Sequence, residues 1–180
     1  MSAGPSPGPA GAAARGTSGG HRLEATLVAA VVVADQVTKA LVRREIPLHD
    51  SVPVIPGVLN LVHVRNTGAA FGFLNDVHFP GKTAVVALVA TGALIAIALY
   101  AARVSSHERL ARPGLALIIG GALGNLVDRL FIGSVVDFVD VVILTWHFWA
   151  FNVADAAITV GVAAILADMM GFNRHVPTTL

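Results

Sequence analysis

Charge is what this 180-residue chain has least of: Asp, Glu, Lys and Arg together make up 13% of it, about half the share of a typical soluble domain. Hydrophobic residues make up 55%, and the mean hydropathy is +0.74. Disorder is excluded for most of the chain, since disordered chains are poor in apolar residues. Because so few charges cannot cover a water-facing surface of this size, the composition predicts a membrane protein.

Cysteine is absent, which excludes disulfides, thiolate metal sites and thiol nucleophiles. Twelve Lys and Arg against eleven Asp and Glu leave a net charge of +1, so no basic field exists and no nucleic-acid partner is expected. The histidines lack metal-ligand spacing, and His107-Glu108 has no second histidine where a zinc-protease helix needs one. We expect neither a metal nor an organic cofactor.

Four apolar segments predict an α-helical polytopic membrane protein. Residues 1–21, rich in Gly, Pro and Ala, are expected to form a disordered tail, and residues 172–180 a second, short tail. A single domain at 22–171 is expected to contain transmembrane helices near residues 23–42, 83–102, 113–130 and 148–170. The uncharged segment 83–102 is long enough for the hydrocarbon core of a bilayer, about 30 Å at 1.5 Å per residue.

The loop at residues 43–82 is long for such a protein, and long loops are usually functional or disordered. Within it, residues 58–64 (VLNLVHV) are apolar and rich in β-branched side chains, which predicts a strand. We therefore expect a small β-sheet lying outside the membrane beside the helix ends. Three arginines within residues 103–112 favour that short loop as cytoplasmic, which places both termini on the cytoplasmic side.

Three aspartates are predicted to converge on one membrane face: Asp128, which ends the third helix, Asp137, and Asp155 at the start of the fourth. Asp128 neighbours Arg129, so an ion pair fixing the helix end is its simplest role. Asp137 and Asp155 have no adjacent cation. Two carboxyl groups close together in a low-dielectric site share one proton, which suits aspartic-protease chemistry. From the residues alone, two structural alternatives remain open: Asp137 could cap a helix, and Asp155 could bond a backbone group.

Other features have simpler interpretations. Asp35 and Lys39 lie four residues apart on one helical face and are expected to form a packing salt bridge. Gly120 and Gly124 match the small-xxx-small pattern of close helix packing, and the two tryptophans are expected to lie at the membrane interface.

An alternative from another class is a small proton-coupled transporter or channel subunit. It would use Asp35, Lys39 and Asp155 as an intramembrane relay, although the chain has no internal repeat. A purely structural four-helix scaffold would leave the group of carboxylates unexplained.

Five motifs, in order, resemble those of lipoprotein signal peptidase, also called signal peptidase II. They are residues 35–39 (DQVTK), 65–71 (RNTGAAF), 120–129 (GGALGNLVDR), 135–138 (VVDF) and 151–155 (FNVAD). The resemblance covers roughly residues 25–170. Each motif alone is weakly specific, whereas five in the right order are highly specific.

The resemblance implies a bacterial inner-membrane aspartic endopeptidase with four transmembrane helices and a small extracytoplasmic β-cradle. Such enzymes act within the lipid bilayer and use no cofactor. They cut the signal peptide from prolipoproteins just before a cysteine that carries a diacylglyceryl group, and the cyclic peptide globomycin inhibits them. Asp137 and Asp155 match the catalytic pair. The remaining matches divide into substrate-binding positions (Asn66, Gly68, Asn125, Arg129, Asn152) and structural positions (Asp35, Lys39, Asp128).

Overall fold

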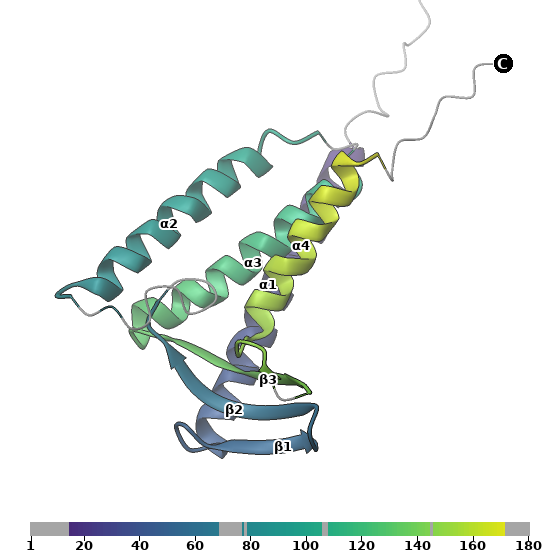
Figure 1. Ribbon diagram of the computed structural model, residues 1–180. Coiled ribbons are helices and arrows are strands. Elements are labelled where there is room, and N and C mark those ends of the chain that lie inside the picture. Colours follow the sequence, from purple (N-terminus) through teal and green to yellow (C-terminus); the bar gives the residue numbers. More distant parts are fainter. Residues whose placement is uncertain (1–14, 69–76, 78, 106–107, 145, 172–180) are drawn as a thin grey trace, which may run out of the picture.

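The computed structural model describes residues 15–68, 77, 79–105, 108–144 and 146–171. In these residues the helices are α1 (Arg15–Glu45), α2 (Lys82–Ala101), α3 (Ala111–Phe131) and α4 (Val153–Met169). The strands are β1 (Ser51–Ile55), β2 (Leu59–Asn66), β3 (Val135–Ile143) and β4 (Trp146–His147). The helices α1, α3 and α4 lie together, α2 diverges from them at one end, and the sheet covers the end of the bundle opposite to the start of α1 (Figure 1).

Glycine lets α3 approach both of its partner helices closely. A Cβ added at Gly120 would lie 2.9 Å from the Cβ of Val31 in α1. A Cβ at Gly124 would lie 2.6 Å from Oδ2 of Asp35 in the same helix. The small-residue pattern predicted from the sequence is thus confirmed as close helix packing, and it brings Asp35 against α3.

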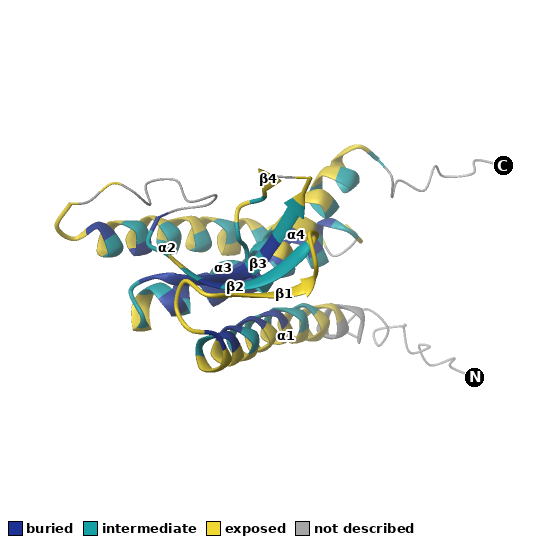
Figure 2. Cartoon of the chain, turned by 60° about the horizontal axis from the view of Figure 1, so that its bottom comes forward, coloured by how far each residue is buried: buried dark blue, intermediate teal, exposed yellow. Residues whose placement is uncertain are grey.

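Lipid, not water, suits the outer surface of the helices. Among the described residues, three helices are long and apolar enough to cross a membrane: residues 20–45 of α1, α2 and α3. Large apolar side chains of α2 are exposed, with Leu88 at 73% and Val89 at 67%, and α2 is exposed along most of its length (Figure 2). The fourth helix has 17 residues, about 25 Å at 1.5 Å per residue.

All four strands pair antiparallel in the order β1-β2-β3-β4. The strand predicted at residues 58–64 is confirmed as β2. Its partner β3 was expected neither as a strand nor as part of the sheet, although its residues 135–143 are largely β-branched. Since β3 joins α3 to the segment before α4, the sheet is built from two loops and not from one.

A left-handed glycine redirects the chain from α3 into β3. Gly133 has φ 80°, and its N–H and that of Ile132 both donate to the carbonyl oxygen of Asp128, at 3.1 and 2.8 Å. These bonds satisfy a carbonyl group that the last turn of a helix would otherwise leave unpaired. The turn places Val136 and Phe138 in a small core with Val42 of α1 and Ile46, which directly follows that helix.

Two helix starts differ from the sequence prediction. The first helix begins at Arg15, not near residue 23, so the end of the predicted tail is helical. The last helix begins at Val153, not at 148, because residues 146–147 pair with β3 and Asn152 caps the helix. Predictions for residues 1–14 and 172–180 lie outside the described part of the chain.

The contact between α3 and α4 gives a stability prediction. A Cβ at Gly121 would lie 2.8 Å from Cγ1 of Ile158 and closer still to the backbone oxygen of Ala154, so Gly121→Ala must push the helices apart. We expect a destabilisation of about 1–3 kcal/mol, seen as a lower midpoint of thermal unfolding in detergent by far-UV circular dichroism. Gly92→Ala in α2, where a Cβ meets nothing within 4 Å, is the matched control and should not lower the midpoint.

Candidate active site

A buried ammonium group lies between two carboxylates from different helices. Nζ of Lys39 is 2.8 Å from Oδ2 of Asp35 and 3.1 Å from Oδ2 of Asp128, and all three side chains are 0% exposed. The predicted Asp35–Lys39 salt bridge is therefore confirmed, with Asp128 of α3 as a second partner. Breaking such a pair by removing one member costs far more than an exposed pair, since it leaves an uncompensated buried charge.

Asp128 does not form the ion pair with Arg129 that its place in the sequence suggested. Its carboxylate faces Lys39 and accepts the backbone N–H of Val136 at 3.1 Å, so it fixes the start of β3. Gln36, which the sequence analysis did not single out, donates to Oδ1 of Asp128 at 3.2 Å and to the carbonyl oxygen of Gly124 at 3.1 Å. Neighbouring residues on a helix point in different directions, which explains why adjacency misled.

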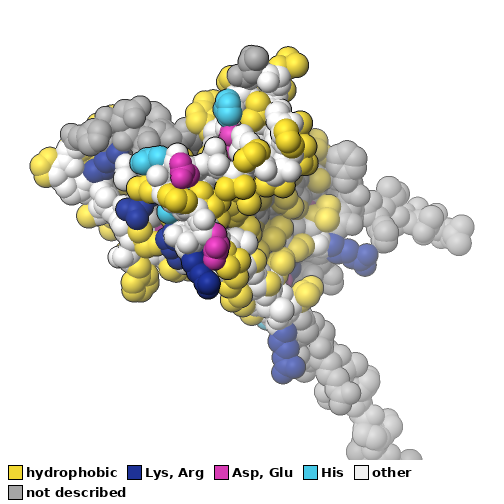
Figure 3. All heavy atoms as spheres, turned by 90° about the horizontal axis from the view of Figure 1, so that it is seen from below, with side chains coloured by type: hydrophobic (Ala, Val, Ile, Leu, Met, Phe, Trp, Pro, Cys, Tyr) yellow, Lys and Arg dark blue, Asp and Glu magenta, His cyan; other side chains and the backbone are white. Residues whose placement is uncertain are grey.

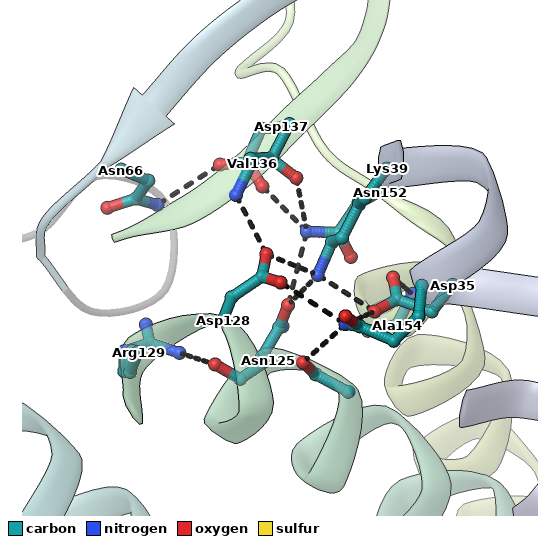
Figure 4. Close-up of polar contacts among 12 residues, drawn as sticks. Asp35, Lys39, Asn66, Asn125, Asp128, Arg129, Val136, Asp137, Asn152 and Ala154 are labelled. Carbon is teal, nitrogen blue, oxygen red and sulfur yellow. Dashed lines mark hydrogen bonds and ion pairs between the residues drawn. The ribbon is translucent and has the colours of Figure 1, made fainter. Parts of the chain in front are cut away.

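Two asparagines connect this ionic cluster to the other two aspartates. Oδ1 of Asn125 accepts from Lys39 Nζ at 2.8 Å and from Asn152 Nδ2 at 3.2 Å. The amide nitrogens then donate outward, that of Asn125 to Oδ1 of Asp155 at 2.8 Å and that of Asn152 to Oδ1 of Asp137 at 2.7 Å. Figure 4 shows these contacts converging from α1, α3, α4 and β3.

Asp155 is positioned by the first turn of α4. The side chain of Asn152 accepts from the backbone N–H of Asp155 at 3.0 Å, and the carboxylate of Asp155 accepts the backbone N–H of Asn152 at 3.3 Å. This reciprocal pair is a capping box, which satisfies two backbone donors that a helix start leaves free. The alternative that Asp155 bonds a backbone group is therefore confirmed. The same carboxylate also accepts from Asn125, so this bond does not remove Asp155 from the polar cluster.

Asp137 lies on β3 and is 4% exposed. Its second oxygen accepts from Nδ2 of Asn66 at 3.2 Å. The pKa of Asp137 is raised to about 7. Burial is the main cause, the charge of Asp155 acts in the same direction, and the amides of Asn66 and Asn152 oppose the shift. The alternative that Asp137 caps a helix is wrong, because the residue is paired within the sheet opposite Val64.

Arg129 ties the loop after β2 to α3. Its Nη2 donates to the carbonyl oxygen of Gly68 at 2.9 Å, and its Nη1 to that of Asn125 at 3.2 Å. The N–H of Gly68 in turn donates to Oδ1 of Asn66 at 2.9 Å, which orients the Asn66 amide toward Asp137. The structure therefore brings together every site residue singled out from the sequence, while their catalytic and substrate-binding roles stay predictions.

An apolar pocket opens beside Asp155, with a volume of about 590 Å³. It is lined by residues before α4 and by one face of its first turns: Phe148, Trp149, Ala150, Phe151, Asp155, Ala156, Ile158, Thr159 and Val160. Three of these residues are aromatic, and Trp149 is one of the two tryptophans that the sequence predicts to lie at the membrane interface. A carboxylate at the edge of an apolar pocket can act on a polar group of a ligand whose remainder is hydrophobic.

Chain-wide comparisons agree with this geometry. Residues 27–171 match the family model described as signal peptidase (SPase) II. The chain belongs to the signal peptidase II family. It is 48% identical over 157 residues to a lipoprotein signal peptidase of Nitratidesulfovibrio vulgaris, covering 87% of this chain and 93% of that protein. It is 43% identical over 155 residues to the one of Geobacter metallireducens, covering 86% and 94%.

A solved bacterial membrane enzyme has a similar fold. The TM-score is 0.75 at 31% identity, and the alignment covers 87% of this chain and 94% of that one. Membership of the signal peptidase II family makes this protein a membrane-embedded aspartic protease that acts on prolipoproteins. The transporter alternative fails on the same evidence, and two of the three residues of its proposed relay, Asp35 and Lys39, form the buried salt bridge.

The buried cluster predicts a large effect of one substitution. Lys39→Met keeps most of the side-chain volume but leaves the carboxylates of Asp35 and Asp128 without their ammonium partner. We expect a loss of about 3–5 kcal/mol of stability, measured by thermal unfolding in detergent. Arg44→Met removes only the pair with Glu45, whose side chains are 80% and 64% exposed, and should unfold like the wild type. Equal midpoints for both variants would show that the cluster contributes nothing.

Proposed function

We propose that Asp137 and Asp155 form the catalytic pair of this signal peptidase II. The observation that carries the proposal is Asn152, whose side chain donates to Asp137 while its backbone N–H donates to Asp155. One residue therefore holds both carboxyl groups, and the high pKa of Asp137 means that the pair retains one proton near neutral pH. An ionised carboxylate beside a protonated one is the arrangement that general acid–base hydrolysis needs.

The reaction follows from these protonation states. The ionised carboxylate takes a proton from a water molecule whose oxygen attacks the carbonyl carbon of the scissile peptide, while the protonated carboxyl donates to the carbonyl oxygen. The tetrahedral intermediate then breaks its C–N bond: the protonated carboxyl gives its proton to the leaving nitrogen, and a hydroxyl of the intermediate returns a proton to the ionised carboxylate. The products are an amine and a carboxylic acid, and the pair again holds one proton. Pairs of this kind titrate as a unit, so either carboxyl can fill either role at a given moment.

Around the pair, fixed polar groups suit an extended peptide. Asn66, Gly68, Asn125, Arg129 and Asn152 are proposed to bind the substrate backbone, since each bonds to the pair or to a neighbour of it. The apolar pocket beside Asp155 is proposed to receive a hydrophobic part of the substrate. A peptide that continues into a lipid-modified cysteine on one side and an apolar signal helix on the other fits this division.

Four membrane-spanning helices are proposed, with α4 as the fourth. It begins directly after the capping box, and large apolar side chains along it are exposed, among them Val160 and Leu166. The start of α1 and the end of α4 lie opposite to the sheet (Figure 1). We therefore place both termini in the bacterial cytoplasm and the β-cradle and the catalytic pair at the outer face of the inner membrane.

The proposed substrates are prolipoproteins cut just before a diacylglyceryl-modified cysteine. Globomycin is the proposed inhibitor, as a cyclic peptide that would occupy the same site. Cutting at the membrane surface suits both, because water reaches the helix ends while acyl chains stay in the bilayer.

Removing either carboxylate tests the pair. Asp137→Asn and Asp155→Asn keep the size of the side chain but cannot take a proton from water, so each should lower kcat by at least about a hundredfold. Cleavage of a diacylglyceryl-modified prolipoprotein by the purified enzyme in detergent measures the effect. Asp168→Asn, in the last turn of α4, is the control and should cleave normally. Normal cleavage by either active-site variant would remove that aspartate from the proposed pair.

The raised pKa of Asp137 predicts the pH dependence. Its pKa lies above the ordinary value of 3.8, so the protonated form is favoured in the folded protein until the pH passes about 7. Above that pH both carboxyl groups are ionised and no acid remains, so kcat/KM should fall with a limb near pH 7. Initial rates across pH 5–9 at constant ionic strength measure this limb, and an unchanged rate up to pH 9 would contradict it.

A further inference from the structure

The segment that leads into α4 runs back along β3 and carries both tryptophans of the chain. We call residues 146–151 the aromatic arm. Backbone pairs hold its two ends: His147 lies opposite Val142, and the N–H of Phe151 donates to the carbonyl oxygen of Val139 at 3.1 Å. Because the N–H of Phe148 donates to Val141, the arm holds one residue more than β3 between these bonds, as in a β-bulge.

Aromatic rings stack edge to face along this arm. The ring centroids of Trp146 and Trp149 are 5.9 Å apart at 87°, and those of Phe148 and Phe151 are 6.1 Å apart at 84°. Phe148, Trp149 and Phe151 also line the pocket beside Asp155. The position of the arm therefore decides the shape of the pocket wall.

Two side-chain bridges connect the arm and its continuation to β3. The inner bridge is in the catalytic site, where Asn152 donates to Asp137 at 2.7 Å. The outer bridge joins Nδ1 of His147 to Oδ2 of Asp140 at 2.9 Å. Asp140 follows Asp137 by three residues on β3, so the same strand supplies the acceptor of both bridges.

The chemistry of the outer bridge is fixed by its neighbours. Asp140 is buried, with 7% of its surface exposed. Its Oδ2 also accepts from Nδ2 of Asn60 on β2 at 2.9 Å. A carboxylate can only accept, so Nδ1 of His147 carries the hydrogen whether the ring is neutral or charged. His147 itself is 63% exposed in its side chain, on the sheet end, where histidine and acidic side chains lie among hydrophobic ones (Figure 3).

We propose that His147 and Asp140 are positioning residues for the proteolytic reaction: their hydrogen bond fixes the aromatic arm and thereby the wall of the substrate pocket. The two-residue strand β4 is exposed at both positions, so backbone pairing alone holds this end of the arm weakly. The proposal rests on the proposed function, in which this pocket receives a hydrophobic part of the prolipoprotein. It predicts an effect on substrate binding and none on the proton transfers at Asp137 and Asp155.

Two substitutions of His147 distinguish the effect of losing its hydrogen bond from the effect of changing its side chain. His147→Val favours a strand but has no donor, whereas the Nδ2 of His147→Asn can take the place of the ring Nδ1. With a diacylglyceryl-modified prolipoprotein in detergent micelles, His147→Val should raise KM three- to tenfold and leave kcat within twofold of wild type. His147→Asn should restore KM to within twofold. Asp140→Ala, which also removes the bond from Asn60, should raise KM as well. Adding His147→Val to it should have no further effect, since the bond between His147 and Asp140 is already absent.

Near-UV circular dichroism gives a readout that does not depend on activity. Since both tryptophans lie in the arm, the tryptophan bands should weaken in His147→Val at unchanged far-UV signal and persist in His147→Asn. An unchanged KM in His147→Val, a fall in kcat alone, or equal impairment in His147→Asn would overturn the proposal. A wild-type enzyme that fails to cleave the prolipoprotein would instead contradict the proposed function, and the near-UV spectra would still decide whether the bond fixes the arm.

Discussion

An ammonium group inside a membrane-embedded helix bundle costs several kcal/mol unless anionic and dipolar groups surround it. Here that constraint falls on Lys39, which is enclosed by Asp35, Asp128 and the amide oxygen of Asn125. Satisfying one cation thus sets the distance and rotation of α1 against α3. Since Asp35 also accepts the backbone N–H of Ala154 at 3.0 Å, the start of α4 is fixed by the same cluster.

The geometry around the proposed catalytic pair depends in turn on this ionic cluster. Asn125 accepts from Lys39 with its Oδ1 and donates to Asp155 with its Nδ2, whereas Nδ2 of Asn152 donates both to Oδ1 of Asn125 and to Asp137. The bonds to Lys39 and between the two asparagines fix the orientation of both amides. The N–H donors to Asp137 and Asp155 are therefore in place before substrate binds. Preorganised dipoles of this kind act without reorganisation during the reaction. The ionic cluster therefore positions the two amides that bond to the proposed catalytic pair.

The membrane class, the helices and the residues of the site could be predicted because each leaves a local mark: uncharged runs, carboxylates in apolar surroundings and five ordered motifs. Contacts between distant segments leave no such mark. The partner of Asp128 lies 89 residues away at Lys39, and sequence adjacency pointed instead to Arg129. The strand β3 was missed because its short apolar segment lies between two helices and its pairing with β2 cannot be read from the local sequence. His147, exposed and isolated in sequence, gave no sign of its bond to Asp140.

The order in which this cluster is assembled has a consequence for membrane insertion. Asn125 follows Lys39 by 86 residues, roughly 4–17 s of synthesis at about 5–20 residues per second. Throughout that interval α1 enters the bilayer without α3 or α4. Asp35, one helical turn from Lys39 on the same helix, is the partner present from the beginning. The first helix therefore carries its own counter-ion for Lys39. When α3 inserts, Asp128 and Asn125 add the remaining partners of the ammonium group.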